Sequence, residues 1–322
     1  MDLVAVDIGG THVRVALAQA QRGRVLSIGT PVTLKTSDYA SFQTAWEAFG
    51  AEARTPLPRA VGIAIACPTG GEVLKLTNNP WIIRPALIGE QLGIDQCNIV
   101  NDFNAVGHAV GQLSEDYFQH LGGPEVRFPE TGTISIVGPG TGLGVAHVLR
   151  TGGDYHVNAT EGGHIDFAPL DSLEDAILLR LRARYRRVSV ERVVAGPGLV
   201  EIYEALAAIE GRAVQSIDDR ALWELALSGQ DSLATAALDR FCMILGSVAG
   251  DIALAQGASG VVIAGGLGLR LAGALAASGF SARFCAKGRF ESMMANIPVK
   301  LITHPQPGLF GAAAAFAKEH PQ

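Results

Sequence analysis

Hydrophobic residues near the N-terminus fall into short runs whose patterns predict strands. Residues 3–7 are aliphatic up to Asp7, which indicates a buried strand. Between 13 and 18, aliphatic side chains alternate with Arg14 and Ala16, which favours a half-buried strand over a helix. A Gly-Gly-Thr turn joins the two runs, so we expect a β-hairpin at the start of the chain.

Two more apolar runs follow the predicted hairpin. Residues 60–66 fit a buried strand that stops at a Cys-Pro-Thr-Gly-Gly stretch, and residues 97–100 fit a short strand that ends at Asn101-Asp102. A helix is predicted at 103–113, because apolar residues share one face there.

The pattern begins again in the second half of the chain. Residues 133–137 predict a strand, 138–144 form a glycine-rich loop, and 145–149 predict the return strand. Ser172, with Asp175 three residues later, is typical of a helix start. The remaining segments predict helices at 176–187, from Pro197 to Gly211, at 234–256 and at 267–277, with a strand at 260–264.

Strands and helices alternate along the chain, so the predicted fold class is α/β. The repeated hairpin indicates two related domains, which we place at 1–112 with 303–322 and at 113–302. The C-terminal segment 307–318 is apolar and alanine-rich, and we expect it to fold back as a helix onto the first domain.

Composition narrows the class of protein. A chain of 322 residues with 48% hydrophobic residues has enough apolar material for a sizeable core. Its net charge of −6 argues against a broad nucleic-acid surface, and its four cysteines are dispersed without paired metal-ligand spacing. The start of the chain lacks a basic segment, and no apolar run approaches the roughly 20 residues that span a bilayer. We therefore expect a soluble cytoplasmic protein with neither a nucleic-acid nor a membrane partner.

The two glycine-rich loops differ from the common nucleotide motifs. A P-loop requires GxxxxGK[ST], and neither loop supplies the lysine. A dinucleotide fingerprint counted from Gly138 requires glycine at 143, where Leu143 stands. Both motifs also lead from a strand into a helix, whereas these loops lead back into a strand.

A β-hairpin with a glycine tip still presents backbone N–H groups to an anion. Glycine lets the backbone approach phosphate closely and adopt positive φ, and Thr11 and Thr141 add hydroxyl donors. Either loop alone is more often a tight turn, but two loops with a Gly-Thr step favour phosphate binding. Asp7 lies beside the first loop and is suited to hold Mg²⁺ through water, with capping of the turn as the alternative.

Eight stretches give the sequence a family resemblance. In chain order they are VDIGGTHVRVALA, IAIACPTGG, IVNDFNAV, VGPGTGLGVAHV, TEGGHIDFAP, SVERVVAGPGLV, GVVIAGG and HPQPGLFGAAA. The chain resembles the bacterial glucokinase family of the actin-like ATPase and sugar-kinase superfamily. The cysteine cluster that binds zinc in the related ROK kinases is missing from the sequence.

This resemblance implies a fold and a reaction. The fold would have two actin-like (ribonuclease H-like) lobes with a ligand cleft between them, commonly in a homodimer. The reaction would transfer the γ-phosphoryl group of ATP, with Mg²⁺, to the 6-hydroxyl of D-glucose, giving glucose 6-phosphate and ADP.

The resemblance also implies roles for individual residues. Asp102 matches the general base that takes the proton of the acceptor hydroxyl. Residues that match sugar contacts, or border the sugar, are Pro68, Thr69, Asn101, Asp102, Glu161, His164 and Glu191. Residues that match the first phosphate loop are Val6, Asp7, Ile8, Gly9, Gly10 and Thr11. Gly138, Gly140 and Thr141 match the second loop, and Gly265 and Gly266 match the turn beside the adenosine.

Simpler interpretations of the same residues stay open at this point. Asp102 is also placed to cap the helix that follows it, and Glu191 fits a solvated position in a short helix. Glu161 and His164 could begin a metal site, although no third ligand has suitable spacing. A basic run at a helix C-terminus is typical of a solvated face; it comprises Arg180, Arg182, Arg184, Arg186 and Arg187.

Departures from the family pattern are few: Asn79-Pro80-Trp81 varies an Asn-His-Thr-Trp stretch of the family, and two others concern the phosphate loops. His12 stands where asparagine is more frequent in the family, and Pro139 where a small residue is usual. Three alternative functions remain: a kinase for another hexose such as mannose or an amino sugar, a sugar-responsive repressor, and a filament or chaperone-type ATPase. A repressor needs an N-terminal DNA-binding extension, and the ATPase has no need of Glu161 and His164.

Overall fold

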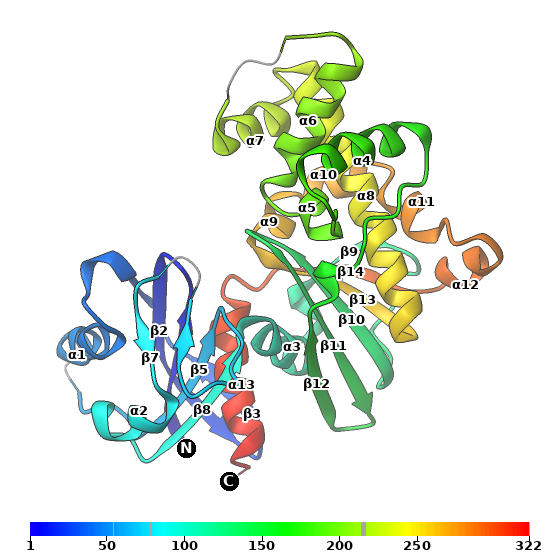
Figure 1. The fold of residues 1–322 in the computed structure, drawn as a ribbon. Coiled ribbons are helices and arrows are strands. Elements are labelled where there is room, and N and C mark those ends of the chain that lie inside the picture. The colour runs from blue at the N-terminus through cyan, green and yellow to red at the C-terminus, as the bar shows by residue number, and fades with distance from the viewer. Residues whose placement is uncertain (54, 77–78, 214–216, 322) are drawn as a thin grey trace. The chain divides into compact units, whose positions relative to one another are not determined.

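A computed structural model describes residues 1–53, 55–76, 79–213 and 217–321 (Figure 1). The chain divides into two compact units. Unit 1 consists of Met1–Ser114, Val157–Ala159 and His304–Gln322, and unit 2 of Glu115–His156 and Thr160–Thr303. Each unit has its own six-stranded sheet and its own helices, so the predicted α/β class is confirmed.

The sheet of unit 1 starts from the predicted N-terminal hairpin. Its strand order is β3 (Arg24–Ile28), β2 (His12–Gln21), β1 (Asp2–Ile8), β5 (Ala60–Ile65), β8 (Gln96–Asn101), with β4 (Val32–Lys35) also paired to β2. β1 and β2 are antiparallel, whereas β5 and β8 run parallel to β1. A separate two-stranded ribbon joins β6 (Leu74–Lys75) and β7 (Ile82–Ile83).

Helices cover both faces of this sheet (Figure 1). They are α1 (Phe42–Ala53), α2 (Pro85–Leu92), α3 (Asp102–Gln112) and α13 (Pro307–Glu319). Successive side chains of β1 point to opposite faces. Val4 and Val6 share a core with α1 and α2, while Leu3 and Ala5 share one with α13. The C-terminal helix therefore returns to the first domain, as predicted.

Two glycines allow α13 to lie very close to its neighbours. A Cβ on Gly62 of β5 would collide with the carbonyl oxygen of Ala312 in α13. A Cβ on Gly311 of α13 would collide with the carbonyl oxygen of Ala105 in α3. This close packing fixes the start of α13 beside the end of β1.

Unit 2 repeats the arrangement with a second hairpin. Its strand order is β12 (Tyr155–Thr160), β11 (Leu143–Thr151), β10 (Thr131–Pro139), β13 (Ala258–Ile263), β14 (Val299–Ile302), β9 (Phe118–Gly122). β10 and β11 are antiparallel, as predicted for residues 133–149, and β13 and β14 run parallel to β10. β9 is antiparallel to β14.

The helices of unit 2 gather around one long helix, α8 (Ser232–Gln256). The others are α4 (Ser172–Arg184), α5 (Val190–Val194), α6 (Gly198–Ile209), α7 (Asp219–Ser228), α9 (Gly265–Arg270), α10 (Ala272–Ala277), α11 (Phe280–Cys285) and α12 (Glu291–Met294). Within the described residues, α8 alone is long and apolar enough to cross a membrane, and 72% of its apolar 18-residue stretch is buried inside the protein. That burial is typical of a core helix, and Phe241, Ile244 and Leu245 are fully enclosed in the core of unit 2.

Three sequence predictions for unit 2 need correction. The N-cap of α4 is Asp171, whose side chain accepts a hydrogen bond from the Glu174 N–H at 3.0 Å, so the helix begins one residue earlier than a cap at Ser172 implies. α4 also ends at Arg184, three residues before the predicted end. The predicted helix at 267–277 is two helices, because the backbone at Leu271 leaves the helical conformation between α9 and α10.

Candidate functional site

The first glycine loop is the tip of the β1–β2 hairpin, and polar groups of unit 1 hold it by its carbonyl oxygens. The Gly9 N–H donates to the His12 carbonyl at 2.9 Å, closing the turn. Thr36, which is buried, donates its hydroxyl to the Gly10 carbonyl at 3.1 Å and its N–H to the Thr11 carbonyl at 3.0 Å. Asn79 Nδ2 donates to the Gly9 carbonyl at 3.3 Å. The support from Thr36 has no signal in the sequence, because Thr36 and Gly10 are 26 positions apart.

Asp7 lies beside this loop in a crowded environment. It is the register partner of Arg14 across the hairpin, and its Oδ2 lies 3.6 Å from Arg14 Nη1. A Cβ on Gly308, at the start of α13, would lie 3.1 Å from Asp7 Oδ2. Burial raises the pKa of Asp7 to about 6; the Arg14 guanidinium opposes this rise, and the Asp102 carboxylate adds to it. A cation near Asp7 would therefore stabilise its ionised form.

The next two predicted residues stand at the junction of β8 and α3. Asn101, not Asp102, is the N-cap: its Oδ1 accepts from the Phe103 N–H at 2.9 Å and from the Asn104 N–H at 3.4 Å. Asn101 Nδ2 donates to the Cys67 carbonyl at 3.4 Å. Asp102 is the first residue of the helix, and its Oδ1 also accepts from the Phe103 N–H at 2.9 Å. The capping alternative for Asp102 is therefore wrong, since Asn101 fills that position.

Parallel pairing brings these groups to one edge of the sheet. β1, β5 and β8 are neighbouring parallel strands, so their carboxyl ends meet at the same edge. Asp7 lies near the end of β1, Pro68 and Thr69 follow β5 after Cys67, and Asn101-Asp102 end β8. The charge of Asp102 contributes to the raised pKa of the Cys67 thiol, after burial as the larger cause. Unit 1 thus gathers its predicted sugar and phosphate residues in one place.

Two of the predicted nucleotide residues act only through the backbone or the core. Val6 and Ile8 have fully buried side chains within the sheet of unit 1. Their side chains are therefore unable to touch a ligand at the edge, and they serve to anchor the loop that follows them.

The second glycine loop, the tip of the β10–β11 hairpin, is held differently. The Gly140 N–H donates to the Gly142 carbonyl at 2.8 Å, and the Gly140 carbonyl accepts from the Gly196 N–H at 2.7 Å. The Leu143 N–H donates to Glu191 Oε2 at 2.9 Å. Thr141, at the tip, is exposed. Glu191 is therefore not the solvated helix residue that its local sequence allowed.

Positive φ is required at one glycine of this region, and it lies outside both tips. The backbone at Gly9, Gly140 and Gly142 is outside the left-handed region, contrary to the expectation that the loop glycines use positive φ. Gly265 has φ +81°, and a Cβ there would lie 2.6 Å from the Pro139 carbonyl oxygen. Gly265 therefore fits against the end of β10 only because it has no side chain.

Glu161 and His164 flank a single 3₁₀ turn, Gly162–His164, beside the second loop. His164 Nε2 lies 3.8 Å from Glu161 Oε2, and both side chains are more than half exposed. A Cβ on Gly163 would collide with the Leu143 carbonyl, so this turn packs tightly on the start of β11. Leu143 therefore links two predicted sugar residues: its carbonyl packs against the turn that carries His164, and its N–H donates to Glu191.

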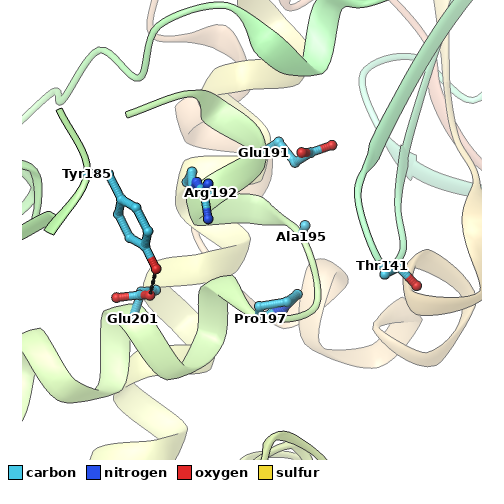
Figure 2. A pocket seen from close by; sticks show the side chains of 7 residues that line it. All are labelled: Thr141, Tyr185, Glu191, Arg192, Ala195, Pro197 and Glu201. Atoms are coloured by element: carbon cyan, nitrogen blue, oxygen red, sulfur yellow. Dashed lines mark hydrogen bonds between the residues drawn. The ribbon is translucent and has the colours of Figure 1, made fainter. Parts of the chain in front are cut away.

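A small pocket of about 110 Å³ opens beside Glu191 (Figure 2). It is lined by Thr141, Tyr185, Glu191, Arg192, Ala195, Pro197 and Glu201. The Tyr185 hydroxyl donates to Glu201 Oε1 at 2.9 Å, and the Arg192 guanidinium lies 4.1 Å from the centre of the Tyr185 ring. Tyr185, Arg192 and Glu201 were not among the predicted site residues, because no sequence motif joins all three.

Three arginines of the predicted basic run, Arg180, Arg184 and Arg187, lie close to carboxylates of their own unit. Arg184 Nη1 lies 2.6 Å from Glu201 Oε2 and 3.2 Å from Glu204 Oε2, and Arg187 Nε lies 2.6 Å from Asp166 Oδ1. These pairs support the expectation of a solvated face over a nucleic-acid surface.

No group of three or more His, Cys, Asp and Glu side chains is placed to hold a metal by itself in the part of the chain that the structure describes. Asp7 offers a lone carboxylate beside a loop of backbone N–H groups. This arrangement fits Mg²⁺, which keeps several waters and takes further oxygens from substrate phosphates.

Comparison with known proteins gives one consistent family. The family model described as glucokinase matches residues 3–319. The glucokinase of Zymomonas mobilis is 61% identical over 320 residues, covering 99% of both chains. A crystal structure of a glucokinase from an Antarctic psychrotroph matches with a TM-score of 0.87 at 33% identity, covering 98% of each chain. A glucokinase from Balamuthia mandrillaris in complex with glucose shares the fold, with a TM-score of 0.76 at 22% identity over 99% of this chain and 93% of that one.

Proposed function

The chain belongs to the glucokinase family, and from that premise we propose how its residues phosphorylate glucose. The enzyme transfers the γ-phosphoryl group of ATP to the 6-hydroxyl of D-glucose, giving glucose 6-phosphate and ADP. The observation that carries the residue assignment is the meeting of the first glycine loop, Asp7 and Asp102 at the carboxyl edge of the unit 1 sheet. That edge combines phosphate donors, a carboxylate for the metal and a carboxylate for the acceptor hydroxyl.

Asp102 acts as the general base. Phosphoryl transfer asks the protein mainly for positioning and charge neutralisation, but the acceptor hydroxyl must lose a proton as the new P–O bond forms. Asp102 Oδ1 is oriented by the Phe103 N–H, and Asn101 already caps the helix. The carboxylate is thus held by the helix start without being needed for the cap.

The sugar is held by hydrogen bonds from several side chains. Glu161 and Glu191 accept from hydroxyl groups, and His164 donates or accepts according to its tautomer. Asn101 contacts the sugar through Nδ2, because its Oδ1 is occupied by two backbone N–H groups. Pro68 and Thr69 border the sugar. A site of this kind discriminates against epimers, since a misplaced hydroxyl leaves polar groups unpaired.

On the family resemblance, we assign each glycine tip to the phosphates of ATP. In unit 1, Gly10 offers its backbone N–H and Thr11 its N–H and hydroxyl, while Gly9, whose N–H closes the turn, leaves room for phosphate. In unit 2, Thr141 offers its N–H and hydroxyl, while Gly138 and Gly140 leave room for phosphate, since the Gly140 N–H donates to the Gly142 carbonyl. Gly265 and Gly266 border the adenosine. Asp7 holds Mg²⁺ through water, and the bound ion supplies neutralisation of the phosphate charge. On the same family resemblance, we propose that the protein is cytoplasmic and forms a homodimer. Light scattering of the purified chain tests the dimer.

The role of Asp102 is tested with Asp102→Ala in a coupled assay containing glucose, ATP and Mg²⁺. We expect kcat to fall on the order of a hundredfold or more, with glucose affinity much less affected. Asp2→Ala, a carboxylate at the far end of β1, is the matched control and retains wild-type kcat. Near-normal kcat in Asp102→Ala would remove the residue from its assigned role.

The identity of the sugar is tested by running glucose, mannose and glucosamine in parallel. Glucose is expected to give the highest kcat/KM. A clearly higher value for another hexose would replace the substrate while leaving the reaction type in place. Full-rate ATP hydrolysis without any sugar would instead favour an ATPase function.

A further inference from the structure

Two hydrogen bonds join the second glycine loop to α5 (Val190–Val194) and to the residues that follow it. Before the middle of α5, the Leu143 N–H donates to Glu191 Oε2 at 2.9 Å. After α5, the Gly196 N–H donates to the Gly140 carbonyl at 2.7 Å. The loop and the short helix therefore form one hydrogen-bonded body within unit 2.

Space, as well as hydrogen bonding, fixes the Glu191 carboxylate on this loop. A Cβ on Gly142 would lie 2.6 Å from Glu191 Oε2 and 3.3 Å from its Cδ. A Cβ on Gly140, two residues earlier in the same loop, would meet its nearest atom, the Gly142 carbonyl oxygen, at 3.9 Å. Neither glycine has positive φ, so the backbone tolerates alanine equally at both positions.

We propose that Gly142 and the Leu143 N–H position the Glu191 carboxylate for the sugar. This inference rests on the proposed function, in which Glu191 binds a sugar hydroxyl. One carboxylate oxygen is anchored on the Leu143 N–H, and a carboxylate has further acceptor positions for the ligand. A loop assigned to phosphate thus also determines sugar affinity, and Gly142 acts through Glu191 as a positioning residue.

The geometry predicts an unusual division of effects. A side chain added to a phosphate loop ordinarily impairs nucleotide binding, because it obstructs close approach of the backbone to phosphate. At position 142 the added methyl group points at the flexible end of Glu191, so it displaces that carboxylate and leaves the loop backbone in place. Sugar binding is therefore affected more than nucleotide binding.

The experiment compares Gly142→Ala with Gly140→Ala in the full chain. Calorimetry gives the Kd of glucose and of ADP with Mg²⁺, and steady-state assays give kcat and the KM of each substrate. For Gly142→Ala we expect the Kd and KM of glucose to rise about tenfold, with kcat and the ADP Kd changed less than threefold. Gly140→Ala is expected to change the glucose Kd less than twofold.

A substitution at Glu191 tests the same contact between this carboxylate and the loop. Glu191→Asp keeps the charge but shortens the side chain by one methylene, so it no longer spans to the Leu143 N–H. It is expected to weaken glucose binding while leaving the ADP Kd unchanged. Adding Gly142→Ala to Glu191→Asp is then expected to raise the glucose Kd by less than a further twofold, because coupled residues act non-additively.

The outcomes separate this inference from the proposed function. Equal glucose affinities in the two alanine variants, or a loss of ADP binding without loss of glucose binding in Gly142→Ala, would overturn the positioning role while the kinase assignment stands. A wild-type chain that binds no glucose would overturn the proposed function itself. Thermal unfolding of each variant shows whether it is folded, and Glu191→Asp provides the same test without touching the loop.

Discussion

The two glycine-tipped hairpins share a topology but differ in how they are supported. In each unit an antiparallel pair is followed by two strands parallel to its first member, in the orders β2-β1-β5-β8 and β11-β10-β13-β14. The tip of the first hairpin is held by neutral groups of Thr36 and Asn79. The second is held by the Glu191 carboxylate and the Gly196 N–H. The two glycine tips therefore have the same backbone topology, but neutral groups hold the first and a carboxylate holds the second.

The charge that accompanies the first hairpin belongs to its strand. Asp7 precedes the tip and is paired with Arg14, whereas the corresponding stretch before the second tip is Val137-Gly138-Pro139. Under the proposed function, this difference would divide the roles of the hairpins: the first would serve Mg²⁺ and the acceptor hydroxyl, and the second would connect phosphate to Glu191 as a sugar residue. Changes at the two loops should therefore have different consequences.

The largest difference is expected on removing the charge beside the first tip. Asp7→Asn keeps the size of the side chain but removes the carboxylate that pairs with Arg14 and that we propose as the protein's oxygen anion for Mg²⁺. We expect kcat/KM for ATP to fall on the order of a hundredfold. Asp38→Asn, an exposed acidic residue following β4, is the matched control, and steady-state kinetics with Mg²⁺ give the measurement. A fall smaller than threefold would refute the special role of the first hairpin.

The next effect concerns the turn that supports the second tip. Gly265→Ala places a Cβ 2.6 Å from the Pro139 carbonyl at φ +81°, whereas Gly266→Ala meets no atom within 4 Å. We expect Gly265→Ala to lower the free energy of unfolding by about 2 kcal/mol, because strained backbone positions cost about 1–3 kcal/mol. Gly266→Ala should change it by under about 0.5 kcal/mol. Denaturant unfolding of both variants checks this, and equal stabilities would contradict it.

Acidic pH offers a third way to separate the two loops. Burial raises the pKa of Asp7 to about 6, with Arg14 opposing and Asp102 adding to the rise, so Asp7 becomes protonated below that pH. We expect kcat/KM for ATP to fall about tenfold from pH 7 to pH 5, since about nine-tenths of a carboxyl group is ionised one unit above its pKa and about one-tenth one unit below it. In Asp7→Asn, kcat/KM for ATP should change less between these two pH values, because only the remaining titratable groups contribute to the change. An unchanged pH profile in Asp7→Asn would assign the titration to another residue.

The raised pKa of Asp7 has the opposite effect on stability: lowering the pH reduces activity but increases the contribution of Asp7 to the free energy of unfolding. The folded-state pKa of Asp7 lies above its ordinary value of 3.8, so the folded chain binds this proton more tightly than the unfolded chain. The contribution of Asp7 to the free energy of unfolding is therefore largest below pH 4 and declines as pH rises from about 4 to about 6. Ionised Asp7 supports activity at the expense of stability, which is common for residues of functional sites.

The sequence predicted what is local and left out what is distant. Both hairpins follow from alternating aliphatic residues around glycine, and the return of α13 to unit 1 follows from its alanine-rich composition. The alternative interpretation of Asp102 as the helix cap is wrong, because Asn101 takes that position; both are good capping residues, and the backbone decides between them.

The contacts of Glu191 could not be predicted in the same way. Its partner, the Leu143 N–H, lies 48 residues away in the chain, and a backbone donor has no signature in sequence. The pocket beside it joins Thr141 to Tyr185 and Glu201, which only the packing of α5 and α6 brings together. Family resemblance pointed to Glu191 as a sugar residue, but the loop that holds it is visible only in three dimensions.

The smallest effect is expected from the neutral support of the first tip. Thr36 is buried, and its hydroxyl donates to the Gly10 carbonyl while its N–H holds the Thr11 carbonyl. Thr36→Val keeps the shape and the N–H but removes the hydroxyl, so the loss is one hydrogen bond of about 1 kcal/mol. We expect the KM for ATP to rise about fivefold with the glucose KM unchanged. Thr33→Val, at an exposed position of β4, is the matched control. Should Thr36→Val raise the glucose KM instead, the first tip would resemble the second in its link to the sugar, and the division between the hairpins would not hold.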